Sequence, residues 1–284
     1  MRALAANIEE VFREAAARWT LVAYFALSSL FVLLFAIAVN LDVVNGAFAG
    51  AKIFGQSVHI GRQSVDLDRL VLGFESGFAA FLYVVGTFLA IFATAHLMPR
   101  LQEKGTVDLY LSRPVGRVPL LLSRYLGGLL LAASNVVYLL GAMWLLVIWK
   151  THLVHPRFFL AAGIILFGIA ALMAFAFLVG TLTSSTAVSI MATFAVFFLS
   201  AILSNHDRIA AALSAEWAAR LVQGLYWVFP KTAQLGGAVV ALVMGDEGPR
   251  RMREALTLQP FITTGLFGAV CLTLACLRFR RKDF

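Results

Sequence analysis

The sequence is organised around runs of about 20 apolar residues, the length that a helix needs to cross a lipid bilayer. Six such runs predict six membrane-spanning helices, at residues 21–39, 74–98, 119–149, 158–182, 187–203 and 261–277. Hydrophobic residues make up 61% of the chain and charged residues 13%, whereas soluble domains contain roughly 45–50% and about 25%. We therefore expect an all-α, polytopic membrane protein that forms a single domain over residues 1–284.

The distribution of lysine and arginine predicts how these spans are oriented. With six spans, both termini share one side, and that side carries a net charge of +6 against +2 on the other. Four cations crowd the last seven residues, and five lie within residues 100–124. Because cytoplasmic loops are enriched in lysine and arginine, we expect both termini in the cytoplasm of a bacterial-type inner membrane.

Residues 205–260 are predicted to form an extracytoplasmic segment. The four-residue spacing of Ile209, Leu213, Trp217 and Leu221 indicates a short helix that lies on the membrane. An alternative counts residues 225–245 as a seventh span, which would move the C-terminal tail outside. Pro230 interrupts that run, and the apolar remainder is short enough to favour a re-entrant or interfacial helix.

The N-terminal segment, residues 1–19, is predicted to be an amphipathic interfacial helix. Its apolar residues recur at helical spacing, namely Leu4, Ile8, Val11, Phe12, Ala15 and Trp19. Glu9 and Arg13 form an i, i+4 pair in the favourable order. A helix of this kind lies in the plane of the membrane interface with its cations toward anionic headgroups.

Residues typical of catalysis or metal binding are scarce. The centres of the spans carry no charged residue, which argues against a proton-coupled carrier. His152 and His155 lack the further ligands of a zinc site, so we expect neither a metal site nor a catalytic residue. Uncharged polar residues inside the spans could instead line a transport path, with Tyr83, Thr87, Asn135, Ser189, Thr193 and Ser200 as candidates. Helix packing is the alternative role for the same residues.

The link between the second and third spans, residues 99–118, is predicted to hold a short cytoplasmic helix. Thr106 is a suitable N-cap, and Asp108 in the first turn complements the helix dipole. Arg113 precedes Pro114, which ends the helix. A short amphipathic helix flanked by cations is suited to docking against another protein.

This link resembles the conserved pattern of ABC-2 type transporter permeases. The matching residues are Glu103, Gly105, Thr106, Leu111, Ser112, Pro114, Arg117, Leu121, Leu122, Arg124 and Gly127. Arg124 stands where lysine is more common in the family. The N-terminal helix and the basic C-terminal ending agree, and within the family the chain is most similar to the compact six-span permeases of the nitrous-oxide-reductase maturation type.

The resemblance implies that the link is a coupling helix that fits a groove on an ATPase subunit. It implies coupling roles for Glu103, Lys104, Gly105, Thr106, Asp108, Arg113, Pro114 and Arg117. None of the five lysines follows a glycine, so the chain lacks the Gly-Lys of a P-loop, and ATP and Mg²⁺ are expected on the partner. The resemblance further implies a homodimer, two ATPase subunits and export.

Three other functions remain open from the sequence. They are an ion-coupled secondary carrier or channel, an intramembrane enzyme, and a membrane anchor for an ATPase that transports nothing. The substrate is not identified by any residue pattern. The expected partners are the ATPase subunit, a second copy of the chain and the lipid bilayer, with no nucleic acid.

Overall fold

The computed structural model describes residues 9–11, 13, 20–44, 47–53, 56–58, 67–102, 116–213, 215–248 and 256–282. Within these residues the chain is almost entirely helical, as predicted. The helices are α2 (Thr20–Ala38), α3 (Leu67–Thr94), α4 (Leu97–Leu101), α6 (Arg117–Thr151), α7 (Pro156–Thr183), α8 (Thr186–Leu203), α9 (His206–Ala212), α10 (Glu216–Val228), α11 (Thr232–Met244), the 3₁₀ turn η1 (Gly245–Glu247) and α13 (Leu258–Arg281).

Each of the six predicted spans coincides with a helix. In the part of the chain that the structure describes, five candidates are long and apolar enough to cross a membrane: α3 continued by α4, then α6, α7, α8 and α13. The described apolar part of α2, Val22–Leu34, is shorter. Helices α10 and α11 meet at 56° and add a sixth candidate if the pair forms one broken span.

A three-stranded antiparallel sheet is the exception to the all-α prediction. Its strands, β1 (Val39–Val44), β2 (Ala47–Ile53) and β3 (Gln56–Val58), pair in the order β1-β2-β3. Polar and apolar residues alternate at the start of β1, as Asn40 and Asp42 are interleaved with Leu41 and Val43. This period of two favours a strand over a helix, so the chain leaves the helical pattern as soon as the first apolar run ends.

The predicted break between the fourth and fifth spans is confirmed. Helix α7 ends at Thr183, and Ser184 adopts a left-handed conformation with φ of 54°. Ser185 is the N-cap of α8, and its hydroxyl accepts a hydrogen bond from the backbone N–H of Val188. Serine is a preferred N-cap because its oxygen satisfies a backbone donor of the first turn.

The outer segment differs from the prediction in one respect. Instead of one helix that carries Leu213 and Trp217 together, the chain forms α9 and α10 with a break between them. Trp217 and Leu221 are exposed on α10, so their four-residue spacing reflects an apolar outer face rather than a face packed on the bundle. The rival span at 225–245 is also broken, because α10 ends at Val228 and α11 begins at Thr232.

The predicted N-terminal helix is described at four residues. Residues 9–11 and 13 are helical, and Arg13 donates a hydrogen bond of 2.6 Å to Glu9. Val11 is fully buried. The rest of the segment lies outside the described residues, so its interfacial position stays a prediction.

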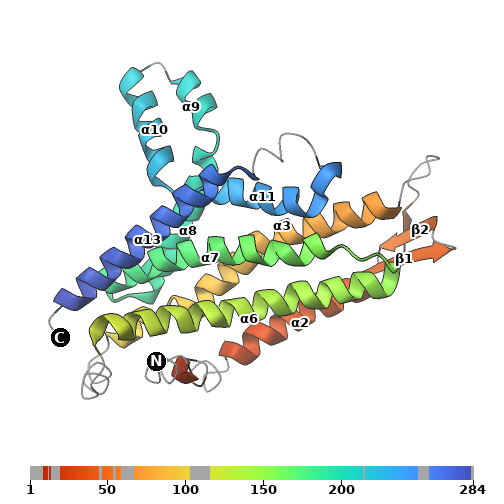
Figure 1. Ribbon diagram of the computed structural model, residues 1–284, viewed down its shortest axis with the longest axis horizontal. Coiled ribbons are helices and arrows are strands. Elements are labelled where there is room, and N and C mark those ends of the chain that lie inside the picture. Colours follow the sequence, from red (N-terminus) through yellow and green to blue (C-terminus); the bar gives the residue numbers. More distant parts are fainter. Residues whose placement is uncertain are drawn as a thin grey trace.

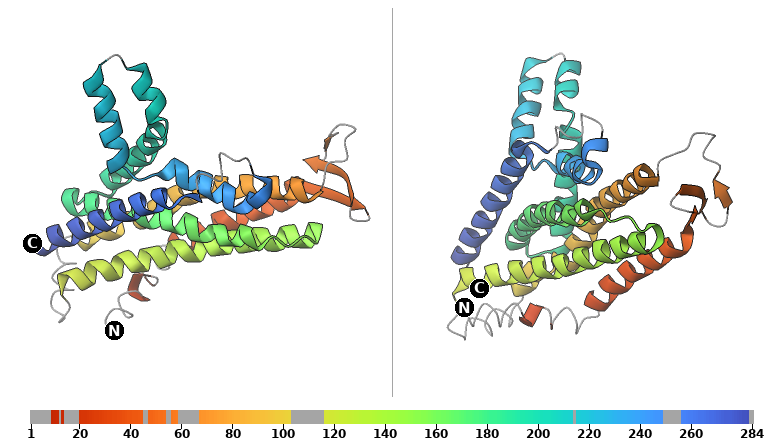
Figure 2. Two further views of the ribbon diagram at one scale, coloured as in Figure 1. Left: turned by 45° about the horizontal axis from the view of Figure 1, so that its top comes forward. Right: turned by 45° about the vertical axis from the view of Figure 1, so that its right-hand side comes forward.

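Helices α2, α3, α6, α7 and α13 run side by side along the long axis of the molecule (Figure 1). Helix α13 ends where α6 begins, at what we call the tail end, and the sheet lies at the opposite, sheet end. The α9–α10 hairpin projects away from the bundle in all three views (Figures 1 and 2). Helix α7 is central, because it contacts α3, α4, α6, α8, α11 and α13.

Small residues allow the other helices to approach α7 closely. A Cβ added to Gly268 of α13 would lie 3.0 Å from the backbone Cα of Ala171 on α7. A Cβ on Gly168 of α7 would lie 3.1 Å from the ring of Tyr83 on α3. In lipid, helix association depends on such close packing because burial away from the membrane gains no hydrophobic free energy.

Substituting Gly268 with alanine is therefore expected to destabilise the bundle. The added methyl group meets backbone rather than a movable side chain, so the cost should be about 1–3 kcal/mol. Gly163→Ala on α7 is the matched control, since nothing lies within 4 Å of its added Cβ. The control should be neutral or stabilising by up to about 1 kcal/mol. Thermal unfolding in detergent micelles measures both, and equal melting temperatures for the two variants would contradict the packing argument.

Candidate functional site

Most of the predicted coupling residues lie outside the described part of the chain. Residues 103–115, which include Glu103, Gly105 and Thr106, belong to this group. Arg117 is described, as the first residue of α6. Its Nη1 donates hydrogen bonds to the backbone oxygens of Lys282, at 2.6 Å, and Arg280, at 3.3 Å. The start of α6 is thus attached to the end of α13.

A polar cluster that sequence reasoning missed lies at the same tail end. Lys282 follows α13, and its Nζ donates to the side-chain oxygen of Gln102, to the Thr181 backbone oxygen at 3.2 Å and to Ser184 Oγ at 2.9 Å. We call Gln102, Arg117, Thr181, Ser184 and Lys282 the tail cluster. It joins the end of α4, the start of α6, the end of α7 and the end of α13.

Gln102 is held in the tail cluster through both ends of its amide. Its Nε2 donates to the backbone oxygen of Gly180 at 2.8 Å, and its Oε1 accepts from Ser184 Oγ at 3.0 Å as well as from Lys282. A Cβ on Gly180 would come within 3.2 Å of both Pro99 and Ser189. The end of α4 therefore packs against α7 at a point where α7 has no side chain.

The six predicted transport-path residues are all buried. Three of them form hydrogen bonds within their own helix: Thr87 to the Tyr83 oxygen, Ser189 to the Ser185 oxygen and Thr193 to the Ser189 oxygen. Such bonds satisfy a hydroxyl without a partner helix. Their role in a transport path stays a prediction.

Tyr83 and Ser200 meet at the break between α10 and α11. Tyr83 donates from its hydroxyl to the Thr232 oxygen at 2.8 Å. Ser200 Oγ donates to the Pro230 oxygen and accepts from the backbone N–H of Thr232 at 3.0 Å. Lys231 N–H donates to Thr264 Oγ1 on α13 at 2.9 Å. Side chains of α8 and α13 thus satisfy backbone groups that the broken helix leaves free, as lipid requires. Tyr83 of α3 adds a further hydrogen bond, to the carbonyl of Thr232.

Asn135 belongs to a separate network on another side of the bundle. Its Nδ2 lies 2.9 Å from Ser28 Oγ on α2 and 3.4 Å from the Tyr24 backbone oxygen. Ser28 also borders a cavity of about 200 Å³ between α2 and α3 whose other lining residues are apolar, such as Phe31 and Phe78. The structure therefore does not bring Asn135 together with Ser200.

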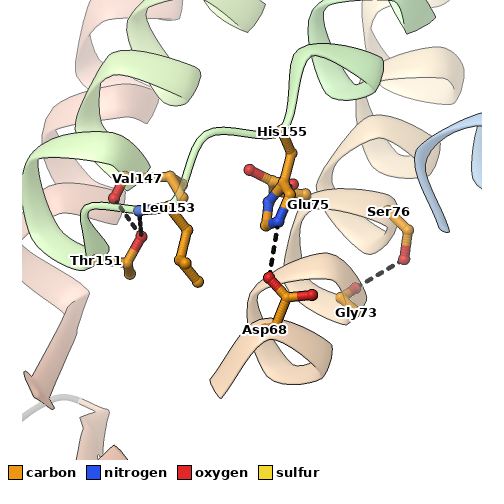
Figure 3. Close-up of polar contacts among 8 residues, drawn as sticks. All are labelled: Asp68, Gly73, Glu75, Ser76, Val147, Thr151, Leu153 and His155. Atoms are coloured by element: carbon orange, nitrogen blue, oxygen red, sulfur yellow. Dashed lines mark hydrogen bonds and ion pairs between the residues drawn. The ribbon is translucent and has the colours of Figure 1, made fainter. Parts of the chain in front are cut away.

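A histidine and two carboxylates meet at the sheet end (Figure 3). His155, just before α7, lies with Nε2 3.0 Å from Asp68 Oδ1 and with Nδ1 2.9 Å from Glu75 Oε2. The Glu75 side chain has no exposed surface. Its contact with His155 is close but too poorly aligned for a hydrogen bond, so it is an ion pair when the imidazole is protonated.

The sequence offered a partial signal for this cluster. Asp68 and Glu75 are seven residues apart and so share one face of α3, but their histidine is far away in sequence. His152 is exposed and follows α6 as its C-cap, in a left-handed conformation with φ of 57°. Within the described residues, no group of three or more His, Cys, Asp or Glu side chains is placed to hold a metal ion.

Removal of the buried carboxylate should weaken the attachment of α3 to α7. Glu75→Ala leaves the largely buried His155 without its buried ion-pair partner, and we expect a loss of about 1–3 kcal/mol in stability. Asp207→Ala is the control, since Asp207 also contacts a histidine, at 3.2 Å, but is 85% exposed; its effect should stay below about 0.5 kcal/mol. Thermal unfolding in micelles compares them, and a Glu75 variant as stable as the Asp207 variant would refute the role.

No curated protein sequence matches the chain. A family model described as "ABC-2 family transporter protein" matches residues 11–284, which is nearly the whole chain. The match includes every candidate span as well as both ends of the predicted coupling segment. The chain belongs to the ABC-2 family of transporters and is a membrane-spanning subunit of an ABC transporter.

Proposed function

We propose that the chain is the permease subunit of an ATP-driven exporter whose ATP hydrolysis takes place on a separate ATPase subunit. The family match over residues 11–284 carries this proposal. The sequence contains no Gly-Lys pair of a P-loop, which supports the division of labour. The ATPase would bind ATP and Mg²⁺, and the permease would supply the path through the membrane.

The docking site for the ATPase is proposed to be the segment around residues 103–115. Support comes from the two described ends of this segment, Gln102 and Arg117, which are both joined to Lys282 at the tail end. A segment held at both ends can pass a displacement of the ATPase to α4 and α6. The nucleotide states of the ATPase must then bind the inward and outward conformations unequally, because a ligand shifts an equilibrium only through differential affinity.

The assembly is proposed to be a homodimer of permeases with two ATPase subunits, of the nitrous-oxide-reductase maturation type. Its support is the sequence resemblance described above. The apolar residues exposed on α2, such as Leu30, Leu33 and Ile37, suit a face that meets lipid or a second copy. Tyr83, Thr87, Asn135, Ser189, Thr193 and Ser200 remain the proposed path residues.

Two substitutions test the coupling role of residues 103–115. Glu103→Ala and Gly105→Pro should lower permease-stimulated ATP hydrolysis by about fivefold or more, since each alters the proposed contact with the ATPase without changing a span. Glu216→Ala, on the exposed surface of α10, is the acidic control and should retain the wild-type rate. ATP hydrolysis by the complex in liposomes is the measurement, and wild-type stimulation by both coupling variants would reject the assignment.

The proposed orientation puts both termini in the cytoplasm of an inner membrane. An epitope tag after residue 284 should be unreachable by antibody in intact spheroplasts and become reachable after permeabilisation. A tag inserted after the exposed Leu213, between α9 and α10, should be reachable in both. A C-terminal tag that antibody binds in intact spheroplasts would overturn the topology and favour the seven-span alternative.

A further inference from the structure

The two ends of segment 103–115 meet at one residue of the C-terminal tail. Gln102 immediately precedes the segment, and its side-chain oxygen accepts a hydrogen bond from Lys282 Nζ. Arg117 lies just after the segment, and its guanidinium donates to the Lys282 backbone oxygen at 2.6 Å. Lys282 therefore contacts one end with its side chain and the other with its main chain.

The Lys282 ammonium group has three N–H donors, and the described residues offer it three acceptors. These are the side-chain oxygen of Gln102, the Thr181 backbone oxygen and Ser184 Oγ. Hydrogen bonds from a charged donor are roughly twice as strong as neutral ones. Burial and the nearby Arg278 lower the pKa of Lys282 from its usual value, which is consistent with an amine that has exchanged part of its hydration for these acceptors.

The turn between α3 and α4 is a place where the chain can bend unless α4 is restrained. Helix α3 ends at Thr94, and a turn at Ala95 and His96 separates it from the five-residue helix α4. A displacement at residue 103 could be absorbed by movement at this turn. Attaching Gln102 to α7 and to Lys282 restrains α4 and so directs the displacement into the long helices.

We propose that Lys282 is a positioning residue that fixes both ends of segment 103–115 against the ends of α7 and α13, and thereby sets the efficiency of coupling between ATP hydrolysis and the bundle. This inference rests on the proposed function, because it assumes that the segment contacts an ATPase. It extends that function to Lys282 in the C-terminal tail, for which the ABC-2 resemblance implies no coupling role.

The test uses the whole complex, purified with the ATPase that the wild-type chain retains and reconstituted in liposomes of phosphatidylethanolamine and phosphatidylglycerol. Lys282→Met removes the donors at similar length, and Lys282→Arg keeps a charged donor. Arg281→Met is the matched control, because Arg281 is the adjacent cation and its side chain is exposed. ATP hydrolysis is expressed per intact complex, so that a loss of folded protein does not enter the rate.

We expect Lys282→Met to lower the stimulated rate per complex at least about fivefold, with an unchanged KM for ATP. Lys282→Arg should recover most of the rate, and Arg281→Met should equal wild type. Gln102→Leu should lower the rate similarly, and adding it to Lys282→Met should cause little further loss, since both residues act through one contact.

Two results would overturn the inference while leaving the proposed function intact. One is a Lys282→Met complex that hydrolyses ATP at the wild-type rate per complex. The other is an equal loss for Lys282→Met and Arg281→Met, which would reflect tail charge rather than position. A wild-type chain that retains no ATPase would instead overturn the proposed function, and the inference with it.

Discussion

The close approach of other helices to α7 is the constraint on which the rest of the bundle depends. Lipid supplies no hydrophobic force between helices, so dispersion at short distance must hold them together. Glycine permits a close approach at Gly168, next to Tyr83, and at Gly268, next to Ala171, where an added Cβ would lie 3.1 Å and 3.0 Å from its neighbour. Because Gly168 and Ala171 are three residues apart, a single turn of α7 sets the spacing of both α3 and α13.

Polar residues inside the bundle form hydrogen bonds with backbone groups, whether or not they also line a transport path. The chain bends by 56° between α10 and α11, and such a break exposes peptide groups that must be satisfied within the membrane. Ser200 and Thr264 come from two other helices to bind the backbone at residues 230–232. The broken helix is therefore a property of three segments together, not of residues 216–244 alone.

The features that the sequence could predict are those that depend on residues close together in the chain. Long apolar runs decide the helices because a spanning segment must satisfy its own backbone. The polar run Thr-Ser-Ser-Thr at residues 183–186 separates the fourth and fifth predicted spans, and the α7–α8 break lies within it. The tail cluster could not be predicted from the sequence, since Gln102 and Lys282 are 180 residues apart. The same holds for Asp68 and His155, which are 87 residues apart. Their pairing follows from how the helices pack, which no local pattern encodes.

Polar contacts attach α7 to the α3–α4 segment at both ends. At the sheet end His155 contacts Asp68 and Glu75, and at the tail end Gly180 and Ser184 bind Gln102. Between these points the helices are in direct contact through apolar side chains. A pair fixed at both ends resists sliding of one helix along the other. If the proposed ATPase displaces the tail end, we therefore expect α3, α4 and α7 to move together rather than as separate helices.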